Sequence, residues 1–118
     1  MVFDILTVGD LCVDLILSGG DVVPQFGQVE KLVDSATLTI GSSSAIFACG
    51  AARLGLKIAF IGVCGDDVFG RFMLDEMQKR NVEIENVIVH PNGFTGLSMI
   101  LARGADRAIL THPGLISA

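Results

Sequence analysis

The sequence contains no tryptophan and no tyrosine, and its eight lysines and arginines face thirteen aspartates and glutamates, for a net charge of −5. Proteins that bind nucleic acid need a basic surface, often with aromatic side chains on which bases stack. Here the basic residues are scattered, with no basic cluster and no polybasic stretch. The composition therefore excludes a nucleic-acid partner and argues against attachment to an anionic membrane.

Long apolar segments are also missing. The longest run without a charge, 35–52, contains four Ser, two Thr and two Gly, unlike a membrane helix of about 20 apolar residues. Asp4 and Asp10, without a basic region before them, argue against a signal peptide. We therefore expect a cytoplasmic protein with no membrane partner.

Cysteine is sparse, and the three that occur form no C-x-x-C pair and have no histidine nearby. Cys12, Cys49 and Cys64 lie in apolar stretches, which favours buried free thiols in a reducing compartment. A disulfide or a metal site is the minor alternative, and we expect no metal ligands.

Charged residues make up 18% and hydrophobic residues 51% of the 118 residues, with a mean hydropathy of +0.64. Ordinary soluble domains have about 25% charged and roughly 45–50% apolar residues. The composition excludes disorder. It also indicates that part of the apolar surface is normally covered by a partner or by polypeptide outside this sequence. The length fits one domain or a piece of a larger one.

Hydrophobic patterning alternates strands with helices. Apolar or alternating runs predict strands at 3–8, 12–17, 37–40, 57–64, 86–90, 96–102 and 108–111. One helix begins at the Gly41–Ser44 cap and ends at Gly55, and a second, with a Phe and Met stripe facing the core, ends at Asn81. Small residues on one side of the first helix allow close packing on a sheet: Ala45, Ala48, Cys49 and Ala52. With alternating strands inserted at 29–40 and after Gly96, the order predicts an α/β parallel sheet with a small β extension.

Gly41-Ser42-Ser43-Ser44 joins a strand to a helix N-terminus. Free N–H groups, the helix dipole and short hydroxyls at such a junction suit an oxygen-rich ligand such as a sugar or a phosphate. An ordinary capped helix is the alternative. The run is not a P-loop, because no Gly-Lys-Ser/Thr follows.

Asp14 is an acid inside an apolar strand, where burial is costly unless the carboxylate is hydrogen-bonded. Ionised, it can accept from two ligand hydroxyls; an acid facing water at a strand end is the alternative. The glycines of 62–70 do not have the G-x-G-x-x-G spacing, which disfavours a dinucleotide-binding domain. His90 and His112 each precede a proline, have no Ser or Cys nucleophile nearby, and are interpreted as loop residues.

Several motifs occur in one order along nearly the whole chain: Val8-Gly9-Asp10 with Asp14, Gly41 to Ala48, Ala51-Ala52-Arg53-Leu54-Gly55, Phe60-Ile61-Gly62, Gly65-Asp66-Asp67 with Phe69-Gly70, Thr95-Gly96 and Thr111-His112-Pro113-Gly114. Together they resemble the N-terminal portion of the ribokinase-like (PfkB-type) carbohydrate kinases.

The resemblance implies a Rossmann-like α/β fold with a β-sheet lid over a sugar site, the lid lying at about 12–40 and 95–112 of a single segment, 1–118. The lid often forms a dimer contact in that family, so a homodimer through the lid sheet is expected. Asp14 would accept from sugar hydroxyls, while Gly41 and Ser42 stand at the family's Gly-Gly pair. The other expected sugar-binding positions are Ser43, Ser44, Ser98, Ile100, Cys12 and Ile46.

Three positions depart from the family pattern. Cys12 and Ile46 replace asparagines that would hydrogen-bond a sugar, which argues against ribose and for a different or less polar polyol. Ser42 replaces the second glycine, and its side chain leaves less room for a sugar to approach the backbone there.

Family members are roughly twice this length or more, and their Gly-x-Gly-Asp anion hole, catalytic aspartate and ATP pocket lie in the later part. No catalytic residue of that kind occurs here. The expected function is the sugar-binding and lid part of a carbohydrate kinase that uses ATP and Mg²⁺ in its full-length form. We expect this chain alone to bind no cofactor and to transfer no phosphate. The alternative is a non-catalytic sugar-binding or dimerisation module on the same half-fold.

Overall fold

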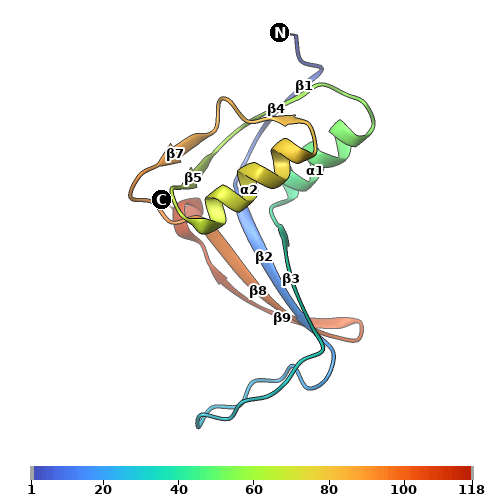
Figure 1. Ribbon diagram of the computed structural model, residues 1–118, viewed down its shortest axis with the longest axis vertical. Helices are drawn as coiled ribbons and strands as arrows, with labels where there is room; N and C mark the ends of the chain where they lie inside the picture. The colour runs from blue at the N-terminus through green and yellow to red at the C-terminus, as the bar shows by residue number, and fades with distance from the viewer. Residues whose placement is uncertain (1, 118) are drawn as a thin grey trace.

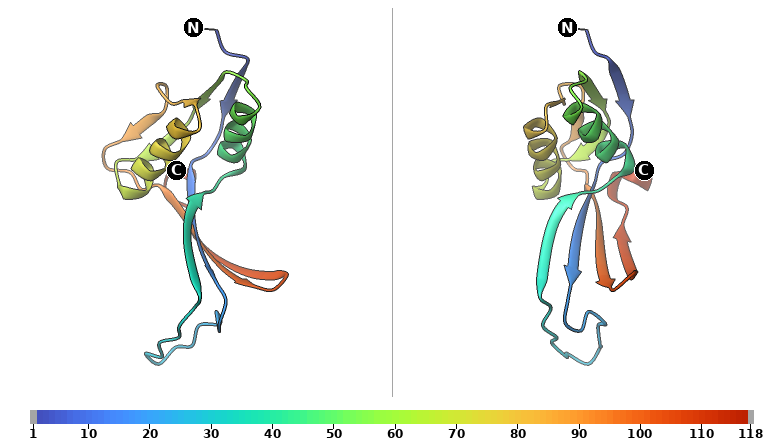
Figure 2. Two further views of the ribbon diagram at one scale, coloured as in Figure 1. Left: turned by 45° about the vertical axis from the view of Figure 1, so that its right-hand side comes forward. Right: turned by 90° about the vertical axis from the view of Figure 1, so that its right-hand side faces the viewer.

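The computed structural model describes residues 2–117 and has two parts (Figure 1). An α/β part contains two helices over short parallel strands, and a long twisted sheet extends from it to one side, as Figure 2 shows. The molecule measures 54 × 33 × 19 Å along its principal axes. This elongated shape follows from the extended sheet, which has no helix of its own to pack on.

In the α/β part, β1 (Ile5–Val8), β4 (Ile58–Ile61) and β6 (Val82–Glu83) form a parallel sheet in the order β1-β4-β6. The helices α1 (Ser43–Arg53) and α2 (Val68–Lys79) pack on this sheet. The expected small-residue side of α1 is buried, as are Met73 and Met77 of α2, which confirms both helix predictions. On the other face of β1, Leu6 and Val8 are 58% and 69% exposed.

The prediction of one continuous strand over 57–64 is wrong. The chain forms β4 and then β5 (Val63–Gly65), and β5 pairs with β7 (Ile88–His90) in a separate two-stranded sheet. Gly62 divides them because the backbone passes close to its Cα: a Cβ there would lie 2.6 Å from the carbonyl oxygen of Gly9. Apolar periodicity does not reveal such a close approach.

The second sheet, which we call the lid sheet, has the order β3-β2-β8-β9. Its strands are β2 (Cys12–Ser18), β3 (Ser35–Ile40), β8 (Gly96–Arg103) and β9 (Asp106–His112), and the short 3₁₀ helix η1 (Gly114–Ser117) follows. The central pair β2–β8 is parallel and both outer pairs are antiparallel. The predicted α/β fold with a β extension and the predicted 96–111 hairpin are confirmed.

The inserted strand begins later than predicted, at Ser35 instead of position 29. Residues 19–34 form a long loop that starts with Gly19 and Gly20, both at positive φ. An ion pair of 2.8 Å joins Lys31 to Asp21 across this loop. Gly19 and Gly20 turn the chain away from β2. The residues after them therefore stay unpaired until Ser35, although apolar and polar residues alternate from position 29.

All three cysteines are buried and free, as predicted. Burial raises the pKa of each thiol, so the thiols are held in their neutral, unreactive form. Within residues 2–117, no helix has the length and apolar character needed to cross a bilayer.

Candidate functional site

Asp14 lies against the turn that leads into α1. A Cβ built on Gly41 would be 2.5 Å from Asp14 Oδ1 and 2.8 Å from the carbonyl oxygen of Cys12. The Gly41 N–H also donates to that Cys12 carbonyl at 2.7 Å. The absence of a side chain at position 41 therefore lets the carboxylate and the start of the serine run occupy one corner.

A row of polar side chains crosses the lid sheet at Asp14. Strand register pairs Asp14 with Thr39 on one side and with Ser98 on the other, and pairs Ser98 with Thr111. The Ser98 and Thr111 hydroxyls are 2.8 Å apart. Cys12 Sγ lies 3.8 Å from Ser98 Oγ, so the thiol borders the same corner.

The electrostatic surroundings of Asp14 are those of a partly desolvated acid. Burial raises the pKa of its carboxyl above the ordinary value, and the positive charge of Arg107 opposes this rise. No hydrogen bond to the carboxylate occurs among the described residues. An anion held without donors in a half-buried place is suited to receive donors from a ligand.

Ser42 and Ser44 connect the end of β1 to the start of α1. The Ser42 hydroxyl donates to the carbonyl of Asp10 and lies 2.9 Å from the Ser44 hydroxyl, which reaches the same carbonyl at 3.4 Å. Ser42 is also the N-cap of α1, accepting from the Ala45 N–H at 3.5 Å. Gly9 is packed against Ser44, with no room for a Cβ. These hydroxyls therefore hydrogen-bond the segment after β1 to the start of α1, and so hold the corner in shape.

Ser42 adopts φ 70° and ψ 124°, a conformation that favours glycine. We expect Ser42→Gly to be more stable than Ser42→Ala by about 1 kcal/mol, because both lose the hydroxyl but only Ala keeps the unfavourable φ. Denaturant unfolding of the two variants measures the difference directly. Equal stabilities would show that the backbone at position 42 relaxes without strain.

The remaining predicted sugar-binding residues are distributed less closely. Ser43 is exposed, and Ile46 is 53% exposed on the first turn of α1. Ile100 is buried and lies two residues beyond Ser98 on the same face of β8, paired with Ile16. The structure thus brings together Asp14, Cys12, Gly41 and Ser98, with the Ser42–Ser44 turn following Gly41 directly.

A second polar cluster, which the sequence did not reveal, fixes the base of the lid. Asp67 caps α2 by accepting from the Gly70 N–H, and it also accepts from the N–H and hydroxyl of Thr95 at 2.9 and 2.7 Å. Thr95 Oγ1 accepts in turn from the Gly65 N–H at 2.9 Å. Thr95 directly precedes β8, so the Gly-Asp-Asp motif ties α2 to the lid. The link spans 28 residues of sequence and has no local signature.

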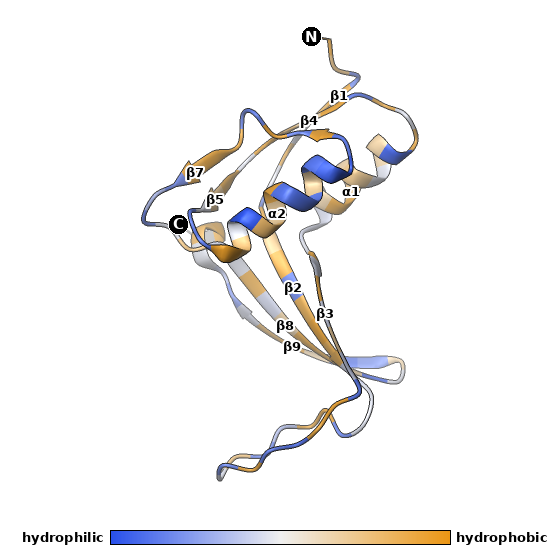
Figure 3. Ribbon diagram, viewed as in Figure 1, coloured by the Kyte–Doolittle hydropathy of each residue, from blue (hydrophilic) through white to orange (hydrophobic). Residues whose placement is uncertain are grey.

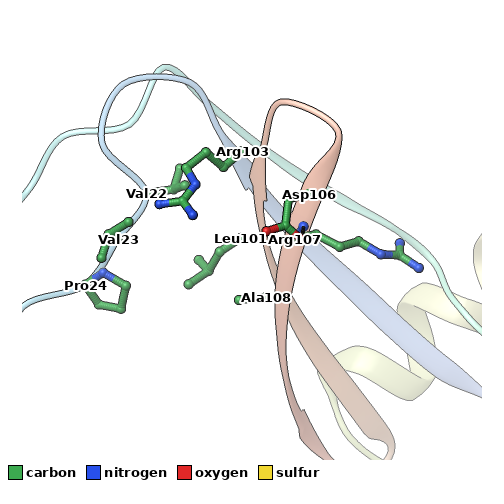
Figure 4. A pocket seen from close by; sticks show the side chains of 8 residues that line it. All are labelled: Val22, Val23, Pro24, Leu101, Arg103, Asp106, Arg107 and Ala108. Atoms are coloured by element: carbon green, nitrogen blue, oxygen red, sulfur yellow. Dashed lines mark hydrogen bonds between the residues drawn. The ribbon is translucent and has the colours of Figure 1, made fainter.

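Two hollows lie near the site without including Asp14. One, of about 390 Å³, is at the carboxyl ends of β1 and β4, beside Asp10 and Gly62. The other, of about 240 Å³, lies between Val22–Pro24 and the β8–β9 hairpin (Figure 4). Its lining residue Leu101 is on the face of the lid sheet opposite Asp14. The first hollow is lined by Asp10, whose backbone carbonyl accepts from the Ser42 hydroxyl of the serine-lined corner.

The pfkB family carbohydrate kinase model matches residues 2–118. The chain therefore belongs to the pfkB family of carbohydrate kinases, and the resemblance found in the motifs is confirmed. A 5-dehydro-2-deoxygluconokinase of Bacillus subtilis is 36% identical over 91 residues, covering 77% of this chain and 26% of that protein. A sugar kinase of Pyrococcus horikoshii is 29% identical over 109 residues, covering 92% and 33%.

Solved structures agree with this fold. The Pyrococcus horikoshii sugar kinase in complex with ATP superposes with a TM-score of 0.74 at 28% identity, covering 91% of this chain and 33% of that one. Arabidopsis thaliana ribokinase complexed with ribose and ATP gives a TM-score of 0.84 at 20% identity, covering 97% and 37%. The second likeness concerns the fold alone. The chain spans about a quarter to a third of the curated relatives it matches.

Proposed function

We propose that this chain is the acceptor-binding and lid part of an ATP-dependent kinase that phosphorylates a hydroxyl of a sugar or polyol. The observation that carries the proposal is the contact of the Asp14 carboxylate with Gly41, in a row that includes Ser98. A carboxylate lacking donors and bordered by hydroxyls is suited to hold vicinal hydroxyl groups. Because the surroundings are pre-formed by strands, the acceptor would be bound in one orientation.

In the complete enzyme, ATP would supply the phosphoryl group and Mg²⁺ would offset its charge. The residues of this chain would bind the acceptor, orient the attacking hydroxyl and, through the lid, limit access of water. Among residues 2–117, no group of three or more His, Cys, Asp or Glu side chains is placed to hold a metal ion. We propose that the catalytic base, anion hole and nucleotide pocket belong to further polypeptide, and that this chain alone transfers no phosphate.

Cys12 and Ile46 favour an acceptor with fewer hydroxyls than ribose. Cys12 is 7% exposed, and its thiol lies beside the Ser98 hydroxyl, where a more strongly hydrogen-bonding side chain would otherwise contact the ligand. A buried thiol is a weak donor, so a methylene opposite it is tolerated better than a hydroxyl. The relative from Bacillus subtilis is named for a deoxy sugar acid, which fits this polarity.

A phosphorylation assay on the complete reading frame tests the kinase proposal. ATP consumption that depends on an added sugar, deoxy sugar or sugar acid is expected. Absence of ATP consumption with every member of such a panel would contradict the enzymatic function and leave the non-catalytic binding or dimerisation module as the better account. We place this activity in the cytoplasm, where ATP is available.

We further propose that two copies associate through their lid sheets. The face opposite Asp14 is lined by apolar side chains: Leu15, Leu17, Leu38, Met99, Leu101 and Leu110. Figure 3 shows apolar residues along β2 and β8, the central strands of the lid sheet. Leu110 is 65% exposed, although it lies in the middle of β9, whose outer edge is unpaired among the described residues. Burial of such a face is the usual driving force for self-association.

Leu110→Asp is expected to convert the dimer to a monomer in sedimentation experiments, since a charge would be desolvated at the interface. Ile109→Asp is the matched control, because Ile109 is the adjacent residue on the opposite face and is 48% exposed. A wild-type protein that stays monomeric at high concentration would contradict the dimer proposal.

A further inference from the structure

The loop over 19–34 extends past the ends of the lid strands, as the views in Figures 1 and 2 agree. Its tip is a turn at 26–28, in which Gly27 and Gln28 have φ angles of 97° and 62°. Phe26 is 99% exposed at this turn. A phenyl ring in water contributes nothing to the stability of a monomer, and a glutamine at positive φ is unfavourable. The tip therefore has the character of a contact element for a surface outside its own fold.

Two neighbouring hollows lie between this loop and the face of the lid sheet opposite Asp14. Their volumes are about 240 and 270 Å³, and both are lined by Val22, Val23 and Leu101. An apolar cavity of about 150 Å³ is large enough for benzene, so each hollow has room for a phenyl ring. Residues 26–28 line neither hollow. The limbs of the loop thus border the hollows, while its tip projects beyond them.

The loop and the hollow nearest the β8–β9 hairpin have opposite charge. The loop contains three acids and one base, and that base, Lys31, is paired with Asp21 at 2.8 Å. Glu30, four residues after Phe26, is exposed. The hollow is lined by two arginines, one of which is Arg103, and by one aspartate. None of the ion pairs among residues 2–117 involves either arginine, so the acidic loop of one copy complements the basic hollow of another.

The length of the loop allows its tip to reach a second lid sheet. Six residues of extended chain, as from Gly20 to Phe26, span up to about 20 Å, whereas packed sheets lie about 10 Å apart. The loop lies on the same face as the hollows, because its valines line them together with Leu101. A two-fold axis through that face would therefore exchange both loops at once and close the assembly as a dimer.

We propose that each copy of the chain inserts Phe26 into the Leu101-lined hollow of a second copy, with Glu30 near the Arg103 of that copy. Phe26 is then the anchor of the lid dimer, since the residues that contribute most to an interface are typically aromatic side chains in apolar pockets. This inference rests on the dimer proposed above, and it adds the segment that holds the two lids together.

A photo-crosslinking amino acid at position 26 tests the contact directly. Two differently tagged forms of the complete protein, each with p-benzoylphenylalanine in place of Phe26, are mixed and irradiated. A covalent dimer is expected, and mass spectrometry should place the link between position 26 of one copy and residues 99–110 of the other. The same amino acid in place of Leu54, which is 83% exposed after α1 and outside the lid, is the control and should give no covalent dimer.

Sedimentation of Phe26→Ala measures the strength of the contact. The dimer Kd is expected to weaken about a hundredfold or more, because each dimer loses two aromatic anchors. Phe26→Leu is expected to retain part of the affinity, since an apolar side chain still fills the hollow. The thermal stability of the monomer should not change in either variant, because Phe26 is exposed in the single chain.

A link from position 26 to the lid of its own copy, or to polypeptide beyond position 118, would overturn the inference. A dimer that Phe26→Ala leaves intact and Leu110→Asp dissociates would contradict the insertion of Phe26 and leave the lid dimer standing. A monomeric wild-type protein would contradict both. Neither measurement uses ATP, so these outcomes are separate from the test of the kinase function.

Discussion

Asp14→Asn is expected to weaken acceptor binding about a hundredfold. The carboxylate has no donor among the described residues and lies against Gly41, so ligand hydroxyls would supply its hydrogen bonds. Hydrogen bonds to a charged group contribute about 1.5–3 kcal/mol each, and an amide that presents N–H groups to hydroxyls loses at least one of them. Calorimetric titration with the preferred sugar measures this effect.

The same substitution is expected to stabilise the unliganded protein by up to about 1 kcal/mol at pH 7, because sites built for ligands often reduce stability. Burial raises the pKa of the Asp14 carboxyl, so its ionised form is disfavoured in the folded state. The penalty is absent at pH values below the unfolded-state pKa and develops as pH rises through the folded-state pKa. The gain should therefore vanish in acid.

Asp10→Asn is the matched control for Asp14→Asn. The Asp10 side chain is exposed, and its contribution to the corner is its backbone carbonyl, which the substitution keeps. Binding and thermal stability are expected to stay near wild type. If both variants bind sugar as well as wild type, Asp14 is not an acceptor ligand; if Asp14→Asn is less stable at pH 7, its carboxylate has a structural partner instead.

Asp67→Asn is expected to cost about 2–3 kcal/mol of unfolding free energy. Its carboxylate accepts from Gly70 and twice from Thr95, which is 3% exposed, and an amide cannot accept from all three donors. Because the cluster joins α2 to the start of β8, the loss is expected to loosen the lid as well. Chemical denaturation, with hydrogen exchange at the β8 amides, measures both effects.

The contribution of Asp67 has a defined pH dependence. Burial acts to raise the pKa of its carboxyl, but the Thr95 and Gly70 hydrogen bonds outweigh burial and lower it below the ordinary value of 3.8. Its stabilisation is therefore present above that value and is lost as pH falls through the lower folded-state pKa. The difference between wild type and Asp67→Asn should be full at pH 6 and shrink below about 3.8.

Asp66→Asn provides the comparison for Asp67→Asn. Asp66 is the preceding acid and forms an exposed pair with Arg71 at 3.1 Å, an interaction of about 1 kcal/mol or less. A stability loss of equal size in both variants would mean that the Thr95 cluster contributes nothing specific. If the stability loss of Asp67→Asn does not change with pH, the ionised Asp67 carboxylate is not the source of the stabilisation.

Local signals predicted most of the elements. The serine cap, Gly55 after α1 at φ 92°, and the hairpin turn at Gly104 are determined by neighbouring residues, so the sequence contains their cause. The separation of β4 from β5 depends instead on the close approach of Gly62 to the backbone of Gly9, more than fifty residues earlier. Periodicity does not record such contacts.

The candidate site was likewise predictable only in part: local sequence identified some of its residues, and long-range strand pairing brought in the others. Asp14 and Gly41 are prominent in the sequence because an acid in an apolar strand and a glycine before a serine run are unusual. That Ser98 and Arg107 share a face with Asp14 depends on strand register across the three strands β2, β8 and β9, which only the structure gives. Alternation within 106–112 could have placed Arg107 and Thr111 on one face, but not beside Asp14.

The most direct test of the acceptor site is an amide chemical-shift titration of the protein with the sugar that it binds best. The account predicts that the largest shifts occur at Gly41 to Ser44, Asp14 and Ser98, with smaller ones at Val22 and Ala108 on the opposite face of the lid. Shifts concentrated at Val22 and Ala108, with Asp14 and Gly41 unchanged, would contradict it.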